Sequence, residues 1–296
     1  MKKRIINIII GLLLAVLLIG ESVYSFKNMQ SSGRRTGETI QLVHNPFESE
    51  IASTTVLGLV LEEAGFNVNL ISVDNAIMYE SIASGESDAM TAAWLPVTHG
   101  TTYDEYKDRL DDLGPNLTGA EAGLTVPSYM DVDSIDELED EDDKTIISIE
   151  PGAGITYQTE EAMEVYDNLN DWELESPSTG AMIASLDTAI QNEEDIVVTG
   201  WRPLWIFMEY DLKILDDPKE VYGEAEEIHT LARKGLKDDH PEAYEIIDNF
   251  EWEVEDMDTV TYDMNKGADD RSAAQNWIDN NRDKVDSWLD GVFDEE

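Results

Sequence analysis

Two tryptophans lie in similar short contexts, Ala93-Trp94-Leu95-Pro96 and Gly200-Trp201-Arg202-Pro203, and each follows an apolar run typical of a buried strand. Each is also preceded, 47 positions earlier, by a loop that leads from a strand pattern into a helix pattern, at Phe47 and at Gly154. The chain therefore resembles two copies of one α/β unit. Open α/β sheets bind ligands beyond the carboxyl ends of their strands, so all four positions are predicted to face one cleft. Because aromatic faces attract cations, a cationic small molecule is the expected ligand.

Strand and helix patterns alternate through both copies. In the first copy we predict strands at 39–44, 67–72 and 89–93 and helices at 49–64, 76–83 and 103–113. In the second copy we predict strands at 145–149, 172–175 and 195–199 and helices at 156–169, 179–191 and 204–210. This alternation indicates mostly parallel sheets with helices on both faces.

Two extended apolar runs, 123–127 and 228–234, fall outside the two copies. We interpret them as strands that cross between two lobes. The helical segment after Pro241, with amphipathic stretches at 270–281 and 283–289, would then return to the first lobe. The predicted division is lobe 1 at 38–126 and 229–296 and lobe 2 at 127–228, in keeping with the usual size of domains.

Acidic residues outnumber basic ones 65 to 19, which gives a formal charge of −46. Such a charge repels nucleic acid and anionic lipid headgroups, so neither is an expected partner. The acidic residues are spread along the chain, and no lysine or arginine occurs from 36 to 106. This pattern is typical of a folded protein adapted to high salt, where screening reduces the repulsion between carboxylates.

The N-terminus begins with Lys2-Lys3-Arg4 and continues with an apolar run from Ile5 to Gly20 that only Asn7 interrupts. Residues 1–25 are therefore predicted to be a signal peptide or an N-terminal membrane anchor, and both interpretations stay open. Residues 26–37 are polar and contain serine and glycine, as in a flexible linker. We expect the protein at the extracellular face of the cytoplasmic membrane, anchored or secreted.

The sequence offers little for catalysis or metal binding. It has no cysteine and only four histidines, and no nucleophile elbow, phosphate-binding loop or paired-histidine motif is present. With 65 acidic residues, a pair of neighbouring carboxylates carries almost no information. We therefore expect a binding protein rather than an enzyme, with no catalytic residues, no metal and no cofactor.

The loop Pro151-Gly152-Ala153-Gly154-Ile155 can serve as an anion site, because glycines at a helix start let backbone N–H groups point outward. Glycine-rich turns are common, and a purely structural turn is the alternative. The position of this loop opposite the tryptophans favours a binding role.

Several motifs in register closely resemble the glycine betaine/proline betaine substrate-binding proteins of ABC importers, the OpuAC/ProX-like family. The motifs are Ser49-Glu50-Ile51-Ala52-Ser53, Trp94-Leu95-Pro96-Val97-Thr98-His99, 151–155, 200–205 and 222–230. The resemblance runs from about Ile40 to near the C-terminus. It implies an α/β, two-lobed periplasmic-binding-protein (type II) fold, in which each lobe is a mostly parallel sheet flanked by helices and the ligand lies in the inter-lobe cleft.

Members of that family enclose a trimethylammonium group between aromatic rings, commonly three tryptophans, and bind the carboxylate through backbone N–H groups and a histidine. By resemblance, Trp94 and Trp201 match two of the rings, and Gly154 and Ile155 match the backbone donors. The carboxylate-binding histidine corresponds to His99. Phe47 departs from the pattern because it stands where related proteins have tryptophan, and its ring offers a weaker face to a cation.

The remaining tryptophans, and His229 on the second crossing run, are interpreted as structural; the tryptophans are 172, 205, 252, 277 and 288. The resemblance implies capture of glycine betaine and its delivery to an ABC permease with its ATPase, for osmoprotection. Choline or carnitine remains an alternative ligand, and a membrane-anchored sensor with the same fold remains an alternative role.

Overall fold

The computed structural model of the protein describes residues 37–139 and 141–292. The predicted signal peptide or anchor, and all of the predicted linker except Gly37, lie outside the described residues. Within the two described ranges, no helix has both the length and the apolar character that a membrane span requires.

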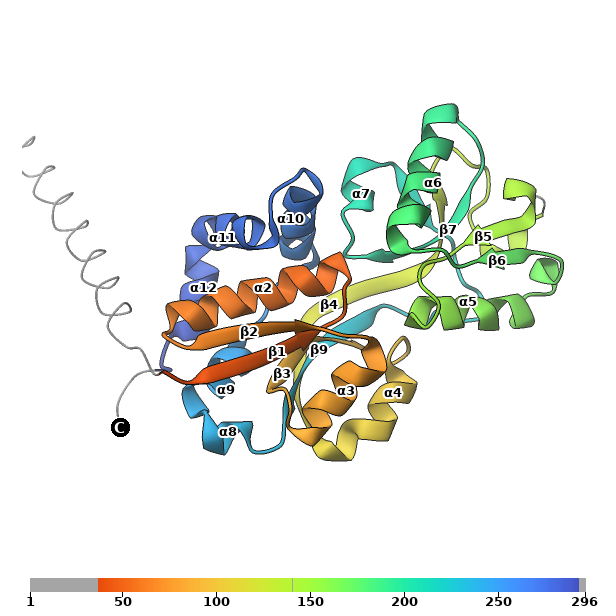
Figure 1. The fold of residues 1–296 in the computed structure, drawn as a ribbon. Coiled ribbons are helices and arrows are strands. Elements are labelled where there is room, and N and C mark those ends of the chain that lie inside the picture. The colour runs from red at the N-terminus through yellow and green to blue at the C-terminus, as the bar shows by residue number, and fades with distance from the viewer. Residues whose placement is uncertain (1–36, 140, 293–296) are drawn as a thin grey trace, which may run out of the picture.

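In the described part of the chain, nine strands form one continuous sheet in the order β2-β1-β3-β9-β4-β7-β5-β6, with β8 paired to β4 (Figure 1). The strands are β1 Thr39–His44, β2 Asn67–Ser72, β3 Ala89–Leu95, β4 Leu110–Pro127, β5 Thr145–Ile147, β6 Glu173–Glu175, β7 Val197–Arg202, β8 Leu212–Ile214 and β9 Glu226–Arg233.

The internal repeat is visible in the strand order. Strand β1 lies between β2 and β3, strand β5 lies between β6 and β7, and all four of these pairs are parallel. Parallel neighbours need a crossover, which helices supply in both copies. We call β1–β3 with α2–α4 the first half and β5–β7 with α5–α7 the second half.

The eleven named α-helices of the described residues flank this sheet (Figure 1). They are α2 Glu48–Glu63, α3 Asn75–Ser84, α4 Gly100–Tyr106, α5 Gly154–Val165, α6 Thr179–Asn192, α7 Ile206–Glu209, α8 Leu236–Asp239, α9 Pro241–Asn249, α10 Val254–Asn265, α11 Asp270–Asn280 and α12 Arg282–Leu289. Short 3-10 turns lie at Lys107–Arg109, Ile135–Glu137, Glu141–Lys144 and Asp167–Leu169.

Strand β4 passes from one half to the other (Figure 1). Its pairing runs along β9 from Leu110 to Ala120, and then along β7 and β8 from Glu121 to Pro127. The predicted helix 103–113 is therefore wrong at its end: α4 stops at Tyr106 and Leu110 already belongs to β4. Pairing with β9 and burial of the Leu110 side chain override the local helical pattern.

The sequence patterns do not predict strand β8, whereas most other predicted elements agree with the structure to within a few residues. As predicted, the C-terminal helices return to the first half, where α10 and α11 pack against α2 (Figure 1). Helix α2 is buried along nearly its whole length because it lies between these helices and the sheet.

The tryptophans interpreted as structural are all buried in the main core. Three of them, Trp252, Trp277 and Trp288, form an aromatic cluster with Phe250 at ring-centroid distances of 5.0–5.9 Å. This cluster fixes the C-terminal helices to one another, so its rings serve packing.

Candidate ligand-binding site

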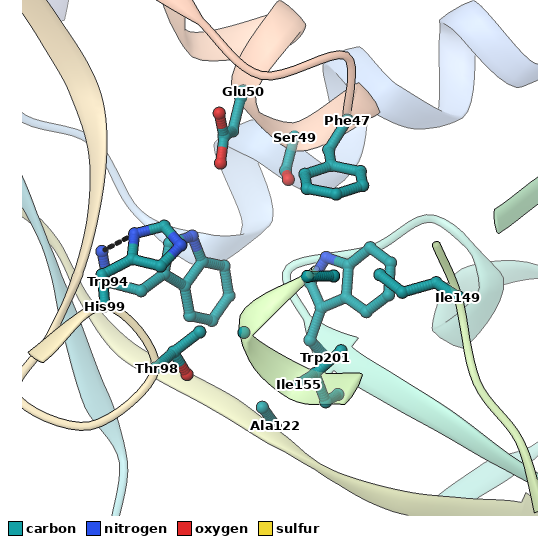
Figure 2. A pocket seen from close by; sticks show the side chains of 12 residues that line it. Phe47, Ser49, Glu50, Trp94, Thr98, His99, Ala122, Ile149, Ile155 and Trp201 are labelled. Carbon is teal, nitrogen blue, oxygen red and sulfur yellow. Dashed lines mark hydrogen bonds between the residues drawn. The ribbon is translucent and has the colours of Figure 1, made fainter. Parts of the chain in front are cut away.

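A pocket lies where the strand-to-helix loops of the two halves face each other (Figure 2). The space within it is about 430 Å³, its open mouth included. It is lined by Phe47, Ser49, Glu50, Trp94, Thr98, His99, Ala122, Ile149, Ala153, Gly154, Ile155 and Trp201. All six residues predicted from the sequence are among them, so the structure brings the whole predicted set together.

The two tryptophans hold equivalent places in the repeat. Trp94 is near the end of β3 and Trp201 near the end of β7, and each keeps only 6% of its surface exposed. Phe47, at the residue before α2, meets Trp201 edge to face at a ring-centroid distance of 6.3 Å. An aromatic ring of the first half thus contacts one of the second half, and together with Trp94 they provide three ring faces around the pocket (Figure 2).

His99 is a neutral histidine. Burial lowers its pKa to about 4, although a hydrogen bond with the Ala92 backbone has a weaker, opposite effect. The backbone N–H of Trp94 donates to Nδ1 of His99 at 3.2 Å, so the ring proton is assigned to Nε2. The ring also packs at right angles to Tyr79, with centroids 6.0 Å apart. His99 can therefore act as a hydrogen-bond donor without adding a charge to the pocket.

Gly154 and Ile155 lie in the first turn of α5, and this N-terminal end of the helix lines the pocket. Within the described residues their N–H groups have no hydrogen-bond acceptor, as is usual at a helix start. The first turn of α5 also contains no acidic residue. Two unused donors and the positive end of the helix dipole make this loop suitable for an anionic group.

The two halves touch beside the pocket at Gly154 and Thr98. A Cβ atom at Gly154 would lie 2.5 Å from Cγ2 and 2.8 Å from the carbonyl oxygen of Thr98, so only glycine fits. The buried carboxylate of Glu226 holds this loop: it accepts hydrogen bonds from the N–H groups of Val97 at 3.0 Å and Thr98 at 2.9 Å, and from the Thr98 hydroxyl. Thr98 also contacts Gln158 of α5 at 3.3 Å. The halves are thus in close contact.

Six lining residues were not singled out from the sequence: Ser49, Glu50, Thr98, Ala122, Ile149 and Ala153. Four of them, Ser49, Glu50, Thr98 and Ala153, belong to the motifs that carry the family resemblance, which is the signal that could have identified them. Residue type did not single out Glu50, because acidic residues are so frequent in this chain. Ala122 reaches the pocket only because β4 pairs with β7 beside Trp201.

No cluster of three or more potential metal-binding side chains occurs in residues 37–139 and 141–292. What the pocket offers is aromatic faces, backbone donors and one neutral histidine, which suits a ligand with a bulky cationic end and an anionic end.

Residues 38–280 match the substrate-binding domain of ABC-type glycine betaine transport systems. The chain belongs to this family. A curated member, the glycine betaine/carnitine transport binding protein GbuC of Listeria monocytogenes, is 48% identical over 177 residues, which cover 60% of this chain and 58% of that protein. The match thus spans less than two thirds of that relative's length.

Two solved structures of the family resemble the protein over nearly their whole length. Lactococcal OpuAC, in its closed-liganded conformation complexed with glycine betaine, is 46% identical with a TM-score of 0.83, covering 85% of this chain and 99% of that chain. ProX of Borrelia burgdorferi is 34% identical with a TM-score of 0.82, covering 87% of this chain and 100% of that chain. The predicted two-lobed α/β fold is confirmed, and so is the prediction of a binding protein rather than an enzyme.

Proposed function

We propose that the protein captures glycine betaine in the pocket between its two halves and delivers it to an ABC permease with its ATPase. Trp94, Trp201 and Phe47 would enclose the trimethylammonium group, and the N–H groups of Gly154 and Ile155 would bind the carboxylate, with His99 at the same end. The observation that supports this most strongly is the pocket itself, which is lined both by rings from the two halves and by the N-terminal end of α5.

The physical basis is the chemistry of a quaternary ammonium group. Such a cation has no N–H donor, so a carboxylate gains little from hydrogen bonding with it, whereas ring faces match its diffuse charge. Each ring contributes on the order of 0.5–2 kcal/mol when desolvated, and charge-assisted bonds to the ligand carboxylate contribute a similar amount.

Ligand binding would also favour the closed arrangement of the halves. The proposed contacts come from both halves: Phe47 and Trp94 from the first, Trp201 and Gly154 from the second. A ligand that contacts both halves binds the closed state more tightly than an open one, and so shifts the population toward it. The closed form is then the species that we propose the permease recognises.

Calorimetric titration with glycine betaine, proline betaine, carnitine and choline at molar salt tests this proposal. We expect glycine betaine to bind, and choline to bind more weakly because it lacks the carboxylate that the N–H groups of α5 would hold. Absence of binding to all four solutes would overturn the proposal.

Carnitine is a second candidate ligand, because the relative GbuC is named as a glycine betaine/carnitine binding protein. The same titration separates the two. A role as a membrane-anchored sensor with the same fold would be favoured if no permease and ATPase genes lie beside this one.

We also propose that the protein works at the extracellular face of the membrane in a saline habitat, secreted or held by residues 1–25. Many of its 65 acidic residues can have no basic partner, because only 19 lysines and arginines exist. Repulsion among them grows when salt falls below about 0.2 M, where the Debye length exceeds roughly 7 Å. The melting temperature should therefore fall at low salt, and ligand should partly restore it. A melting temperature that does not vary with salt would contradict the saline habitat but not the binding function.

A further inference from the structure

Glu50 is a carboxyl group inside the pocket that the proposed function leaves without a role. It lies in the first turn of α2 and lines the pocket beside Ser49, with only 4% of its surface exposed (Figure 2). A buried carboxyl among aromatic rings is costly when charged, so its position calls for a physical account.

The protein partners of Glu50 are neutral. The backbone N–H of Asn45 donates to Oε2 at 2.7 Å, and the Asn45 side-chain amide donates to Oε1 at 3.3 Å. Among residues 37–139 and 141–292, Glu50 forms no ion pair with a lysine, arginine or histidine. A cation that enters the pocket would therefore be the first positive charge close to this carboxyl.

Burial raises the pKa of Glu50 to about 8, although its hydrogen bonds with Asn45 oppose the shift. The neighbouring side chains His44, His99 and Tyr79 do not change charge near pH 8. Burial lowers the pKa of both histidines and raises that of Tyr79, so all three stay neutral. The other titratable groups that act on these neighbours are Asp270 on α11, Tyr103 on α4, and Asp112 and Glu226 on β4 and β9.

We propose that Glu50 is a specificity-determining residue whose protonation sets the preference of the pocket between zwitterionic betaines and purely cationic quaternary ammonium compounds such as choline. The inference rests on the proposed function, because it assumes that a quaternary ammonium group occupies this pocket. In its acid form Glu50 is tolerated beside the carboxylate of a betaine. In its anionic form it attracts a net cation, whereas its attraction for the ammonium of a betaine is offset by repulsion of the carboxylate.

The test is a titration of choline and of glycine betaine from about pH 6.5 to about pH 9.5 at constant molar salt, a range in which one titrating group can change an affinity up to tenfold per pH unit. Neither ligand titrates in this range. We expect the dissociation constant of choline to fall at least about fivefold with rising pH, and that of glycine betaine to stay constant within about twofold or to rise.

The variant Glu50→Gln keeps the size of the side chain and an oxygen that can accept from Asn45, but it cannot ionise. It should show no pH dependence for either ligand, and at the highest pH it should bind choline at least about fivefold more weakly than the native protein does. Glu48→Gln is the matched control: it lies in the same helical turn, burial also raises its pKa, but it does not line the pocket. It should retain the native pH profile.

Asn45→Ala provides a second variant. Loss of the side-chain donor disfavours the anion of Glu50, so the midpoint of the choline profile should move to higher pH. If native protein binds glycine betaine but the relative affinity for choline is independent of pH, or if Glu50→Gln retains the native profile, the inference is wrong and the proposed function stands. If native protein binds neither ligand at any pH, the proposed function itself fails.

Discussion

The two strand-to-helix loops that face the pocket hold equivalent positions in the repeat but differ in chemistry. The loop before α2 presents the ring of Phe47, and the acid of Glu50 accepts from the backbone N–H of Asn45. At the start of α5, glycine stands at the matching place and the first helical turn contains no acidic residue. The N–H groups of Gly154 and Ile155 have no acceptor among the described residues.

This difference shows how a duplicated scaffold can bind a ligand with two unlike ends. A helix start attracts anions, but the first turn of α2 already contains two acidic residues, Glu48 and Glu50, whereas that of α5 contains none. The helix start of the second half is therefore better suited to a ligand anion. The first half contributes aromatic faces instead, and the cavity between the halves becomes polarised.

The largest expected effect is on the glycine loop. Gly154→Ala should weaken glycine betaine binding at least about 100-fold, or about 2.7 kcal/mol, because a Cβ would press against Thr98 and hold the halves apart. Calorimetry measures this directly. Gly180→Ala is the control, because a Cβ atom at that position would meet no other atom within 4 Å, and its affinity should match that of the native protein. An affinity for Gly154→Ala within about twofold of native would show that the halves need not approach at this point.

The aromatic faces come next. Trp94→Ala and Trp201→Ala should each weaken binding at least about tenfold, or about 1.4 kcal/mol, because each removes a desolvated ring face. Trp277→Ala, in the C-terminal cluster, should leave affinity unchanged while lowering the free energy of unfolding by about 3–5 kcal/mol. Equal effects of all three on affinity would contradict the assignment of the rings.

His99→Ala distinguishes the two ends of the ligand. Loss of the Nε2–H donor should weaken glycine betaine about fivefold, about 1 kcal/mol, and choline less than about twofold, because only the former presents a carboxylate. Comparable losses for the two ligands would place His99 outside the carboxylate site.

His99→Ala should also change how the free energy of unfolding depends on pH. With a folded pKa of about 4 against an ordinary value of 6.5, native His99 binds fewer protons than the unfolded chain between these values. The free energy of unfolding therefore decreases as pH falls through that window. Urea unfolding should show that the free energy of unfolding falls less with decreasing pH in His99→Ala than in the native protein. The same dependence on pH in both proteins would argue against a buried neutral ring.

The smallest expected effect on affinity is that of placing a tryptophan at position 47, where related proteins have one. Phe47→Trp should keep the affinity for glycine betaine or tighten it by up to about threefold, because indole offers a stronger face to a cation. Calorimetry at molar salt is again the measurement. A complete loss of binding would mean that another ring forms the third wall.

The sequence predicted the elements of the repeat well because its signals are local. Alternating strands and helices, the Trp-containing strand ends and the Gly154 loop are all readable over short windows. The predictions from sequence fail where pairing between segments far apart in the chain decides the secondary structure. Leu110 belongs to a strand because β9 lies beside it, and β8 exists because β4 offers it a partner.

The candidate site divides in the same way. Residue type and position in the repeat pointed to Trp94, Trp201, Phe47 and the start of α5 as candidates, and the family resemblance alone added His99. Residue type alone could not distinguish Glu50 from the other acidic residues, and no local pattern shows that Glu226 holds the loop that touches Gly154. Burial and hydrogen-bond partners depend on contacts between segments far apart in the chain, and local patterns do not encode them.

The sequence alone thus determined the duplicated α/β plan and the chemical character of the groups at the strand ends, because both are written in short-range periodicity and residue type. Only the tertiary structure decided which of these groups share a pocket, that Glu50 is buried with Asn45 as its hydrogen-bond donor, and that the N–H groups of Gly154 and Ile155 keep no acceptor among the described residues. The reason is physical: the acidity of a carboxyl and the availability of an N–H group are set by the solvent and the partners that folding removes or supplies.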